Sequence, residues 1–176
     1  MRSQRSPLPE RSRTNFSGLR YHPYDPNLEF QTRLLPDPER QVLVFSTSSG
    51  SEVVYERLGW FTAEIAGQTV RLAGFAREGD DQPESLFVPF KDASSGFETY
   101  GGGRYLDVPV QDGLLEVNFN FAYNPYCAFA DGWACPIPPQ ENWLTVPVLA
   151  GELNFVPSID NIDENTGKST DEGAHE

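Results

Sequence analysis

The sequence is poor in several residue types, and each shortage excludes a class of protein. Two of its 176 residues are cysteine and two are histidine, too few for a disulfide-stapled secreted scaffold or a zinc module built on Cys and His. No apolar run reaches the roughly 20 residues of a membrane-spanning helix. Only two of the 13 basic residues are lysine, and the net charge is −13. The lack of a long apolar run argues against a membrane partner. The shortage of basic residues argues against a nucleic-acid partner, because the chain lacks a basic face to neutralise phosphates.

Glycine and proline are plentiful instead, with 15 of each, too many for a helical bundle and without the period of collagen. Between them, short runs with an apolar residue at every second position predict β-strands. Asp112-Gly113 is a type I′ hairpin signal between residues 104–110 and 114–121, and Ala66-Gly67 predicts another hairpin. The sequence therefore predicts an all-β fold, an antiparallel sandwich or barrel of about nine short strands.

Three details of this pattern go further. Residues 114–121 are predicted as one strand, with Phe121 on its apolar face. Residues 143–149 alternate in the same way and are predicted as the last strand. Pro89 removes a hydrogen-bond donor, so the strand that contains it is expected at a sheet edge or at a bulge.

Charge divides the chain into three parts. Residues 1–20 carry a net charge of +4 and two prolines, and we predict a flexible basic arm. Residues 158–176 carry −5 and no aromatic residue, so we predict a disordered acidic tail. The β-rich domain is expected at residues 21–157. The first 20 residues also lack the apolar core of a signal peptide, so we expect a cytoplasmic location.

The surplus of acid with little lysine predicts a protein adapted to concentrated salt. Salt screens the repulsion between carboxylates, which would otherwise oppose the compact state. The alternative is an ordinary acidic protein that folds equally well in dilute buffer.

One segment around residue 100 carries more special residues than a strand requires. Tyr100, Gly102 and Gly103 precede Arg104. Glycine lets a ligand approach the backbone closely, and the guanidinium fork suits a carboxylate or a phosphate. We predict these four residues as ligand-binding. The alternative is a bulged loop whose arginine pairs with a structural acid.

Two further segments supply amides and one acid. Asn118, Asn120 and Asn124 lie at the end of the predicted hairpin, and Glu141 and Asn142 follow a proline-rich segment. We predict all five as ligand-binding, if the polar face of the hairpin lines the mouth of a barrel. The hairpin register brings Arg104 and Tyr105 level with Asn120 and Phe121. We therefore expect one convergent end of the barrel.

That end is predicted in two forms. In the open form a concave cavity is lined by Arg104, Tyr100 and Asn120. In the closed form the loops plug the barrel, and Arg104 pairs with Asp92 or Glu141.

The two cysteines, Cys127 and Cys135, lie eight positions apart at the two ends of one predicted loop. Thiol catalysis needs an adjacent base, and His22 and His175 are the only histidines. A metal held by both thiols and a disulfide between them are alternatives. The preferred interpretation is two small buried side chains that pin the loop. We expect no cofactor.

Several segments occur in a recognisable order: FSGLRY at 16–21, LFVPFKD at 86–92, residues 95–106, residues 120–129, residues 135–142 and residues 150–152. From Ser6 to Glu152 the chain resembles the domain of unknown function 1684 family, in particular its short haloarchaeal members. The resemblance implies a cytoplasmic, β-rich protein and no established activity. Family members usually have an Asp where this chain has Asn118. An amide cannot take up a proton at neutral pH, so a base at that position is not available here.

The function that the sequence favours is a binding module for an anionic small molecule. One alternative is a hydrolase-like enzyme that uses carboxylates near Arg104, chosen from Asp92, Glu98, Asp107 and Glu141. The other is a structural module that joins a second copy or another protein through an exposed strand edge.

Overall fold

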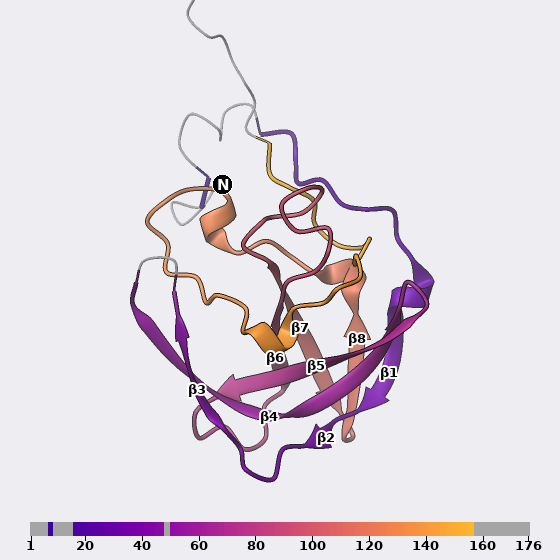
Figure 1. The fold of residues 1–176 in the computed structure, drawn as a ribbon, viewed down its shortest axis with the longest axis vertical. Coiled ribbons are helices and arrows are strands. Elements are labelled where there is room, and N and C mark those ends of the chain that lie inside the picture. The colour runs from indigo at the N-terminus through magenta and orange to yellow at the C-terminus, as the bar shows by residue number, and fades with distance from the viewer. Residues whose placement is uncertain (1–6, 9–15, 48–49, 157–176) are drawn as a thin grey trace, which may run out of the picture.

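A computed structural model describes residues 7–8, 16–47 and 50–156 of the chain. Its eight strands form one antiparallel sheet that curls into a nearly closed barrel (Figure 1). The strands are β1 (Glu29–Arg33), β2 (Leu35–Pro36), β3 (Val42–Ser46), β4 (Glu52–Ile65), β5 (Gln68–Arg77), β6 (Ser85–Phe90), β7 (Arg104–Gln111) and β8 (Leu114–Asn118). Four single 3-10 turns complete the elements of the described residues: η1 (Pro26–Leu28), η2 (Phe119–Phe121), η3 (Tyr126–Ala128) and η4 (Gln140–Asn142). The all-β, barrel-like prediction is confirmed.

The barrel nearly closes because one segment pairs with both ends of the sheet. β1 pairs with β8, and after a single intervening residue β2 pairs with β4 at Leu35 and Trp60. Gly59 permits this approach, since a Cβ at that position would lie 2.3 Å from the Leu35 carbonyl oxygen. The register of β4 with β5 shifts between Arg57 and Gly59. β4 thereby bends without ending, so one strand of 14 residues runs through this stretch.

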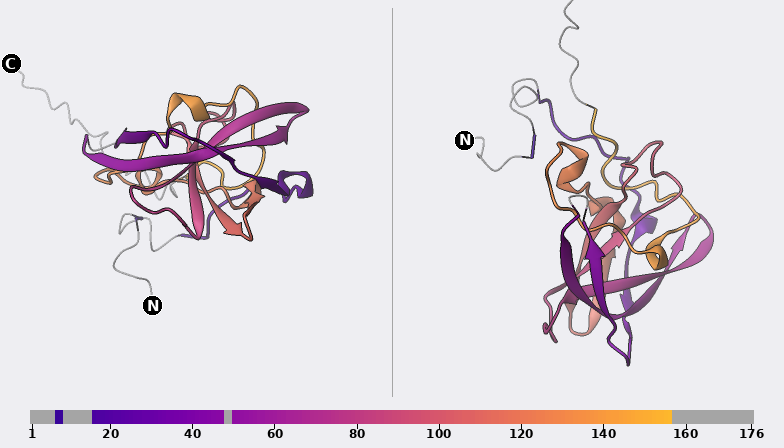
Figure 2. Two further views of the ribbon diagram at one scale, coloured as in Figure 1. Left: turned by 90° about the horizontal axis from the view of Figure 1, so that it is seen from below. Right: turned by 60° about the vertical axis from the view of Figure 1, so that its left-hand side comes forward.

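Both predicted hairpins are present. Ala66 and Gly67 turn β4 into β5, and Asp112 and Gly113 turn β7 into β8. All four residues have positive φ, between 50° and 77°, as a type I′ turn requires. The long β4–β5 hairpin crosses the direction of β7 and β8 steeply, which gives the barrel its shape (Figures 1 and 2).

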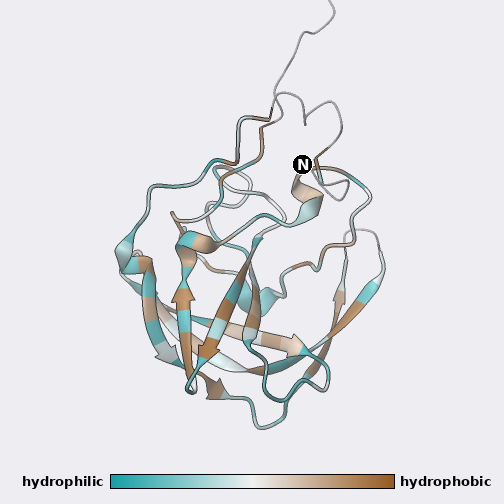
Figure 3. Cartoon of the chain, turned by 180° about the vertical axis from the view of Figure 1, so that it is seen from behind, coloured by the Kyte–Doolittle hydropathy of each residue, from teal (hydrophilic) through white to brown (hydrophobic). Residues whose placement is uncertain are grey.

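The barrel interior is filled by alternate residues of neighbouring strands. Leu86, Val88 and Phe90 of β6 pack with Leu106 and Val108 of β7, and each is at most 1% exposed. Apolar and polar residues alternate along the strands, as the hydropathy colouring shows (Figure 3). The end of the barrel opposite the β7–β8 hairpin is covered by loops and by the chain after β8 (Figure 1).

Two strand predictions are wrong. β8 ends at Asn118, whose side chain accepts a hydrogen bond from the Asn120 amide and starts the η2 turn. Phe121 is consequently 71% exposed. Residues 143–149 form no strand, although the predicted alternation does bury Val146 and Val148. These residues cross the end of the barrel as an irregular segment.

The strand that contains Pro89 is not at an edge, because β6 lies between β5 and β7. Its ladder with β5 is reduced to the pair Phe75 and Phe87. Beside Pro89, which has no N–H, the Asn142 side chain takes the place of the ladder. Asn142 Nδ2 donates to the carbonyl oxygens of Ala73 (3.0 Å) and Pro89 (2.9 Å), and Oδ1 accepts from the Ala73 amide (2.7 Å).

The chain after η2 returns across the outer face of the barrel. Tyr123 bridges to Tyr105 of β7, and Pro136 bridges to Thr47 beyond β3. The segment therefore spans β7 to β3 outside the sheet, over a second hydrophobic cluster centred on Phe45 and Phe75. We call residues 123–136 the covering loop.

The segments around Arg20 and Leu153 lie side by side, since the Leu153 amide donates to the Arg20 carbonyl oxygen at 2.9 Å. Most of the predicted arm and the tail at 158–176 lie outside the described residues. In the part of the chain that the structure describes, every helix falls short of the length and apolarity needed to cross a membrane.

Candidate functional site

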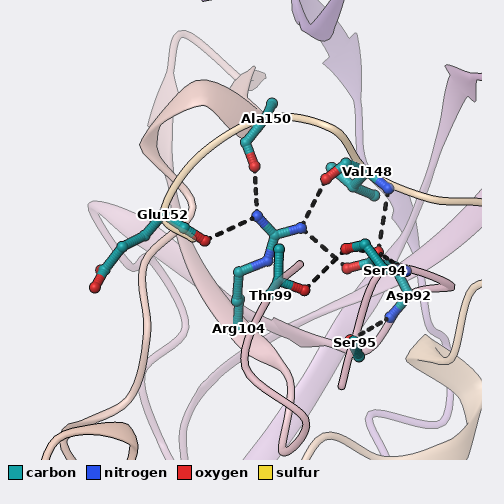
Figure 4. Close-up of polar contacts among 8 residues, drawn as sticks. All are labelled: Asp92, Ser94, Ser95, Thr99, Arg104, Val148, Ala150 and Glu152. Atoms are coloured by element: carbon teal, nitrogen blue, oxygen red, sulfur yellow. Dashed lines mark hydrogen bonds and ion pairs between the residues drawn. The ribbon is translucent and has the colours of Figure 1, made fainter. Parts of the chain in front are cut away.

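Arg104, the residue that most suggests a ligand site in the sequence, points into the covered end of the barrel (Figure 4). Its Nη2 donates to Asp92 Oδ2 at 3.0 Å and to the Val148 carbonyl oxygen at 2.8 Å. Its Nη1 donates to the carbonyl oxygens of Ala150 and Glu152. Four acceptors of the protein therefore surround one guanidinium group.

The Asp92 carboxylate, the partner of Arg104, is also fixed by several hydrogen bonds. Asp92 Oδ1 accepts hydrogen bonds from the amide (2.8 Å) and hydroxyl (2.5 Å) of Ser94 and from the Val148 amide (3.2 Å). The Ser94 hydroxyl also contacts the Thr99 hydroxyl at 2.8 Å. We call Arg104, Asp92, Ser94 and Thr99, with the three carbonyl groups, the Arg104 cluster.

The Arg104 cluster is closed to solvent. Arg104 is 0% exposed and Asp92 is 5% exposed. Burial lowers the pKa of the Arg104 guanidinium, and the negative charge of Asp92 opposes this shift. Pairing of Arg104 with Asp92, which the closed form of the prediction named, is confirmed. A ligand in the open form would have to displace these protein acceptors.

The glycines beside Arg104 serve packing in the structure. Gly103 has φ +94°, and a Cβ there would lie 2.6 Å from the Phe90 carbonyl oxygen and 2.8 Å from Pro138. The ring of Tyr100 lies against Gly102, where a Cβ would be 2.5 Å from it. The loop therefore needs glycine to pack against its neighbours.

Asn118 and Asn120 form a separate cluster with Asp25. Asn120 Oδ1 accepts from the Asp25 amide at 2.8 Å, and its Nδ2 donates to the Asp25 carbonyl oxygen at 2.9 Å. Asn118 Oδ1 accepts from the Asn120 side chain at 3.0 Å. The two side-chain amides thus hold the segment before η1 in place. Asn120 does not lie beside Arg104 on a paired strand, because β8 ends at Asn118.

Asn124 is joined to the Arg104 cluster through Glu152. The Asn124 amide and Nδ2 donate to the two carboxylate oxygens of Glu152 at 3.0 and 2.9 Å. Burial raises the pKa of Glu152, against the opposing effects of the Asn124 hydrogen bonds and the Arg104 charge. Asn124 belongs to the covering loop and is 3% exposed, so Glu152 joins that loop to the Arg104 cluster.

The remaining two predicted residues stabilise the sheet from outside. Glu141 accepts from Arg57 at 2.9 Å, and Arg57 also donates to Asp37 at 2.8 Å. Asn142 bridges β5 and β6, as described above. Neither contacts the Arg104 cluster within the described residues.

A separate hollow lies on the other face of the sheet. A cavity of about 550 Å³ opens between the outer face of the barrel and the covering loop. We call it the aromatic pocket, after the rings of Tyr55, Phe87, Tyr105, Tyr123, Tyr126 and Trp133 in its wall.

Four of these rings form a continuous row across the outer face. Tyr55 of β4 stacks on Phe87 of β6 with centroids 5.2 Å apart. Phe87 meets Tyr105 of β7 edge-on at 4.9 Å, and Tyr105 meets Tyr123 at 5.8 Å. Such pairs prefer stacked or edge-to-face geometry and add to the stability of the wall.

The opposite wall comes from the covering loop. There Tyr126 and Trp133 pack edge-to-face with centroids 4.9 Å apart. Tyr126 is 52% exposed. The pocket is therefore bounded by a rigid sheet on one side and by a loop on the other, an arrangement common to binding sites.

A few polar groups are set among the rings. The Tyr123 hydroxyl donates to Asp107 Oδ2 at 3.0 Å, and the Tyr105 hydroxyl donates to the Pro136 carbonyl oxygen at 2.6 Å. Burial raises the pKa of both phenols, and the charge of Asp107 adds to this for Tyr123. These hydroxyls therefore remain protonated at neutral pH and act as hydrogen-bond donors.

A smaller cavity of about 220 Å³ adjoins the aromatic pocket and shares Tyr105 and Cys135 with it. Tyr100 and Gly102 line this smaller cavity, and Asn124 lines the aromatic pocket. Asn118 lines a third cavity, of about 310 Å³, beside β1 and β8. Four of the nine predicted ligand-binding residues thus border a cavity. Burial, followed by the hydrogen bond to Cys127, raises the pKa of Tyr100 to about 12.

No disulfide joins Cys127 to Cys135. The Cys127 amide donates to Cys135 Sγ at 3.2 Å, and the Tyr100 hydroxyl contacts Cys127 Sγ at 3.6 Å. The residues that the structure describes contain no group of three His, Cys, Asp or Glu side chains suited to a metal ion.

Sequence reasoning missed the aromatic pocket, although a signal is present. Phe87 and Tyr105 occupy outward positions next to buried Leu86 and Leu106. A barrel exposed to water on its outside carries polar residues there. Aromatic residues at outward positions therefore indicate that another segment covers that face.

Comparison with known proteins gives two findings. The family model described as "Protein of unknown function (DUF1684)" matches residues 14–153. The chain is also similar to a solution NMR structure of an uncharacterised protein of Haloarcula marismortui. The two share 33% sequence identity, and the similarity covers 84% of this chain and 82% of that one with a TM-score of 0.68. A search of curated proteins gave no match.

Proposed function

The chain belongs to the DUF1684 family, and we propose that it is a cytoplasmic small-molecule-binding protein whose ligand occupies the aromatic pocket. The observation that carries this proposal is the pocket itself. Its volume of about 550 Å³ lies within the range of ligand sites, which are mostly apolar with a few fixed polar groups. The hydrogen-bonded Tyr123 and Asp107 pair supplies such a group.

The site of the ligand differs from the one that the sequence favours. The sequence favours an anionic ligand at Arg104, whose Nη donors are directed at Asp92 and three carbonyl groups. The proposal therefore rests on the outer face of the sheet. The hydrolase alternative also relied on carboxylates near Arg104. Asp92 is the carboxylate that pairs with it, and both side chains are buried away from solvent.

The test is a ligand screen with a matched pair of variants. A thermal-shift screen of small metabolites in molar salt should give compounds that stabilise the protein. Tyr126→Ala should remove this stabilisation, because Tyr126 is exposed in the pocket wall. Tyr24→Ala is the control, since Tyr24 is 59% exposed and does not border the pocket. Compounds that bind both variants as they bind the wild type would contradict the proposal.

A second candidate function is association through a strand edge. Val42 and Val44 of β3 are 49% and 54% exposed, and Val54 of β4, which pairs with Val44, is 37% exposed. An exposed apolar strand at an edge invites pairing with another chain. Sedimentation of the wild type and of Val44→Lys tests this candidate. A monomer at all concentrations in the wild type would rule out self-association by this edge.

A further inference from the structure

The charges around the aromatic pocket indicate what kind of molecule it would hold. Asp80 and Asp107 line it, and Arg77 is the cationic residue in its wall. The Arg77 guanidinium lies over the Tyr55 ring, 5.9 Å from its centroid. The wall therefore has a surplus of negative charge, in a protein whose net charge is already −13. The charge of the pocket wall and the net charge of the protein would each repel an anion and attract a cation.

The rings favour the same sign of charge. The face of an aromatic ring is negative and attracts cations within about 6 Å of its centroid. The protein uses this elsewhere: Arg57 and Arg71 lie over Trp60 at 4.6 and 3.9 Å, and Lys91 lies over Trp143 at 5.2 Å. Several cations of this chain are thus matched to a ring.

The pocket contains rings without such a match. Among the described residues, no Lys or Arg side chain lies over Phe87, Tyr123 or Tyr126. These rings surround a space large enough for a ligand and border a carboxylate. The hydrogen bond from Tyr123 fixes Asp107 Oδ2, and the exposed carboxylate can still receive a cation on its other side.

We infer that the ligand of the aromatic pocket is an organic cation of the quaternary or alkylated ammonium class, held by the ring faces and by Asp107. The inference rests on the proposed function, because it names the class of ligand for the same pocket. An alkylated ammonium ion is weakly hydrated, so it gains by contact with the negative faces of aromatic rings. A small inorganic cation holds its water shell tightly and does not exchange it for such contacts. A neutral molecule could fill the same space, but Asp107 would add nothing to its binding.

A set of probes of equal shape and different charge tests the inference. The probes are choline, its neutral isostere 3,3-dimethylbutan-1-ol, and the anion 3,3-dimethylbutanoate. Each is titrated into ¹⁵N-labelled protein, and amide shifts are followed at residues 105–107 and 123–126. We expect choline to shift these amides and to bind about tenfold more tightly than the neutral isostere, with the anion weakest.

Two variants separate charge from shape. Asp107→Asn should weaken choline binding about three- to tenfold and leave the neutral isostere unchanged. Tyr126→Ala should weaken both, and Tyr24→Ala should weaken neither. Equal affinities for choline and its isostere, or tighter binding of the anion, would overturn the cation inference and still support the pocket as a ligand site. Absence of shifts with all three probes would also overturn it, and the metabolite screen would then decide the proposed function separately.

Discussion

Arg104 and Tyr105 are neighbours on β7, and their side chains point to opposite faces of the sheet. Arg104 enters the interior and meets only protein acceptors. Tyr105 points outward and lines a cavity. The charged residue therefore completes the fold, and the aromatic one borders the candidate site. Which face a residue occupies decides its role more than its chemical type does.

The two regions also differ in how firmly they are built. In the Arg104 cluster a buried charge, its partner and the surrounding loops are linked by short hydrogen bonds (Figure 4). The aromatic pocket is bounded on one side by the covering loop, whose Tyr126 is half exposed. Substitutions in the first region should mainly change stability, and substitutions in the second should mainly change binding.

The strongest test of this difference is Arg104→Met. Removing the guanidinium leaves the Asp92 carboxylate buried without its counter-charge, which should lower the free energy of unfolding by about 3–5 kcal/mol. Urea denaturation measures the loss. Arg33→Met is the control, because Arg33 is exposed and has no ion pair among the described residues; it should change stability by less than about 0.5 kcal/mol.

A small loss of unfolding free energy in Arg104→Met would contradict the contrast drawn between the Arg104 cluster and the aromatic pocket. If it stayed below about 1 kcal/mol, the cluster would not stabilise the barrel. Arg104 would then be available for the ligand role that the sequence favours.

The next largest effect is expected for Asn142→Ala. The change removes three hydrogen bonds between β5 and β6 and leaves the Ala73 and Pro89 backbone groups without partners. We expect a loss of about 2–4 kcal/mol in urea denaturation. Asn154→Ala, which removes one exposed hydrogen bond to Phe97, should cost less than about 1 kcal/mol. Equal losses in the two variants would show that Asn142 does not replace the ladder.

The fold was largely predictable, because its signals are local. Asp112-Gly113 and Ala66-Gly67 each define a turn by positive φ at two adjacent residues. Alternation then identifies the inward residues of β6, β7 and β8. It fails for residues 143–149, where Leu144 hydrogen bonds to Lys91 (2.7 Å) in an irregular path. Alternation reports burial on one side and does not establish a strand.

The candidate site was less predictable, because it depends on contacts between distant segments. Arg104 meets carbonyl groups more than 40 positions away, and no local pattern reveals that an irregular segment will supply them. The pocket forms because the covering loop crosses from Tyr123 to Pro136 outside the sheet. Of the predicted residues, Asn124 borders this pocket, whereas Tyr100, Gly102 and Asn118 border two other cavities.

Salt should act on the surface of the molecule and leave the Arg104 cluster unaffected. If the acidic composition is an adaptation to salt, the melting temperature of the wild type should rise from dilute buffer into molar potassium chloride. The destabilisation by Arg104→Met should stay constant over the same series, because a buried pair is little screened. Thermal melts of both proteins test this. A flat or falling melting temperature in the wild type would contradict the adaptation.

In the aromatic pocket, Tyr123→Phe should have a small effect on stability. It removes the hydroxyl that donates to exposed Asp107, and a hydrogen bond of this kind contributes about 0.5–1.5 kcal/mol. The ring contact with Tyr105 is retained. Urea denaturation that showed a loss as large as that of Asn142→Ala would mean that the pocket wall is part of the stability core.

The smallest effect concerns Glu152, which lies between the two regions. Burial raises its pKa in the folded protein above the ordinary value of 4.5. Within the window from 4.5 up to the raised pKa, the folded state holds a proton that the unfolded state has released. The free energy of unfolding should therefore fall as the pH rises through this window. Below and above the window, Glu152 should contribute no further change with pH. Glu152→Gln cannot ionise, so urea denaturation across the window should show a shallower decline than in the wild type. Glu84→Gln, an exposed carboxylate, controls for the loss of one negative charge. An equal slope of stability against pH in the wild type and in Glu152→Gln would contradict this prediction. It would show that the Glu152 carboxylate, which joins Asn124 to the Arg104 cluster, is not desolvated, so that the closed interior does not extend as far as Glu152.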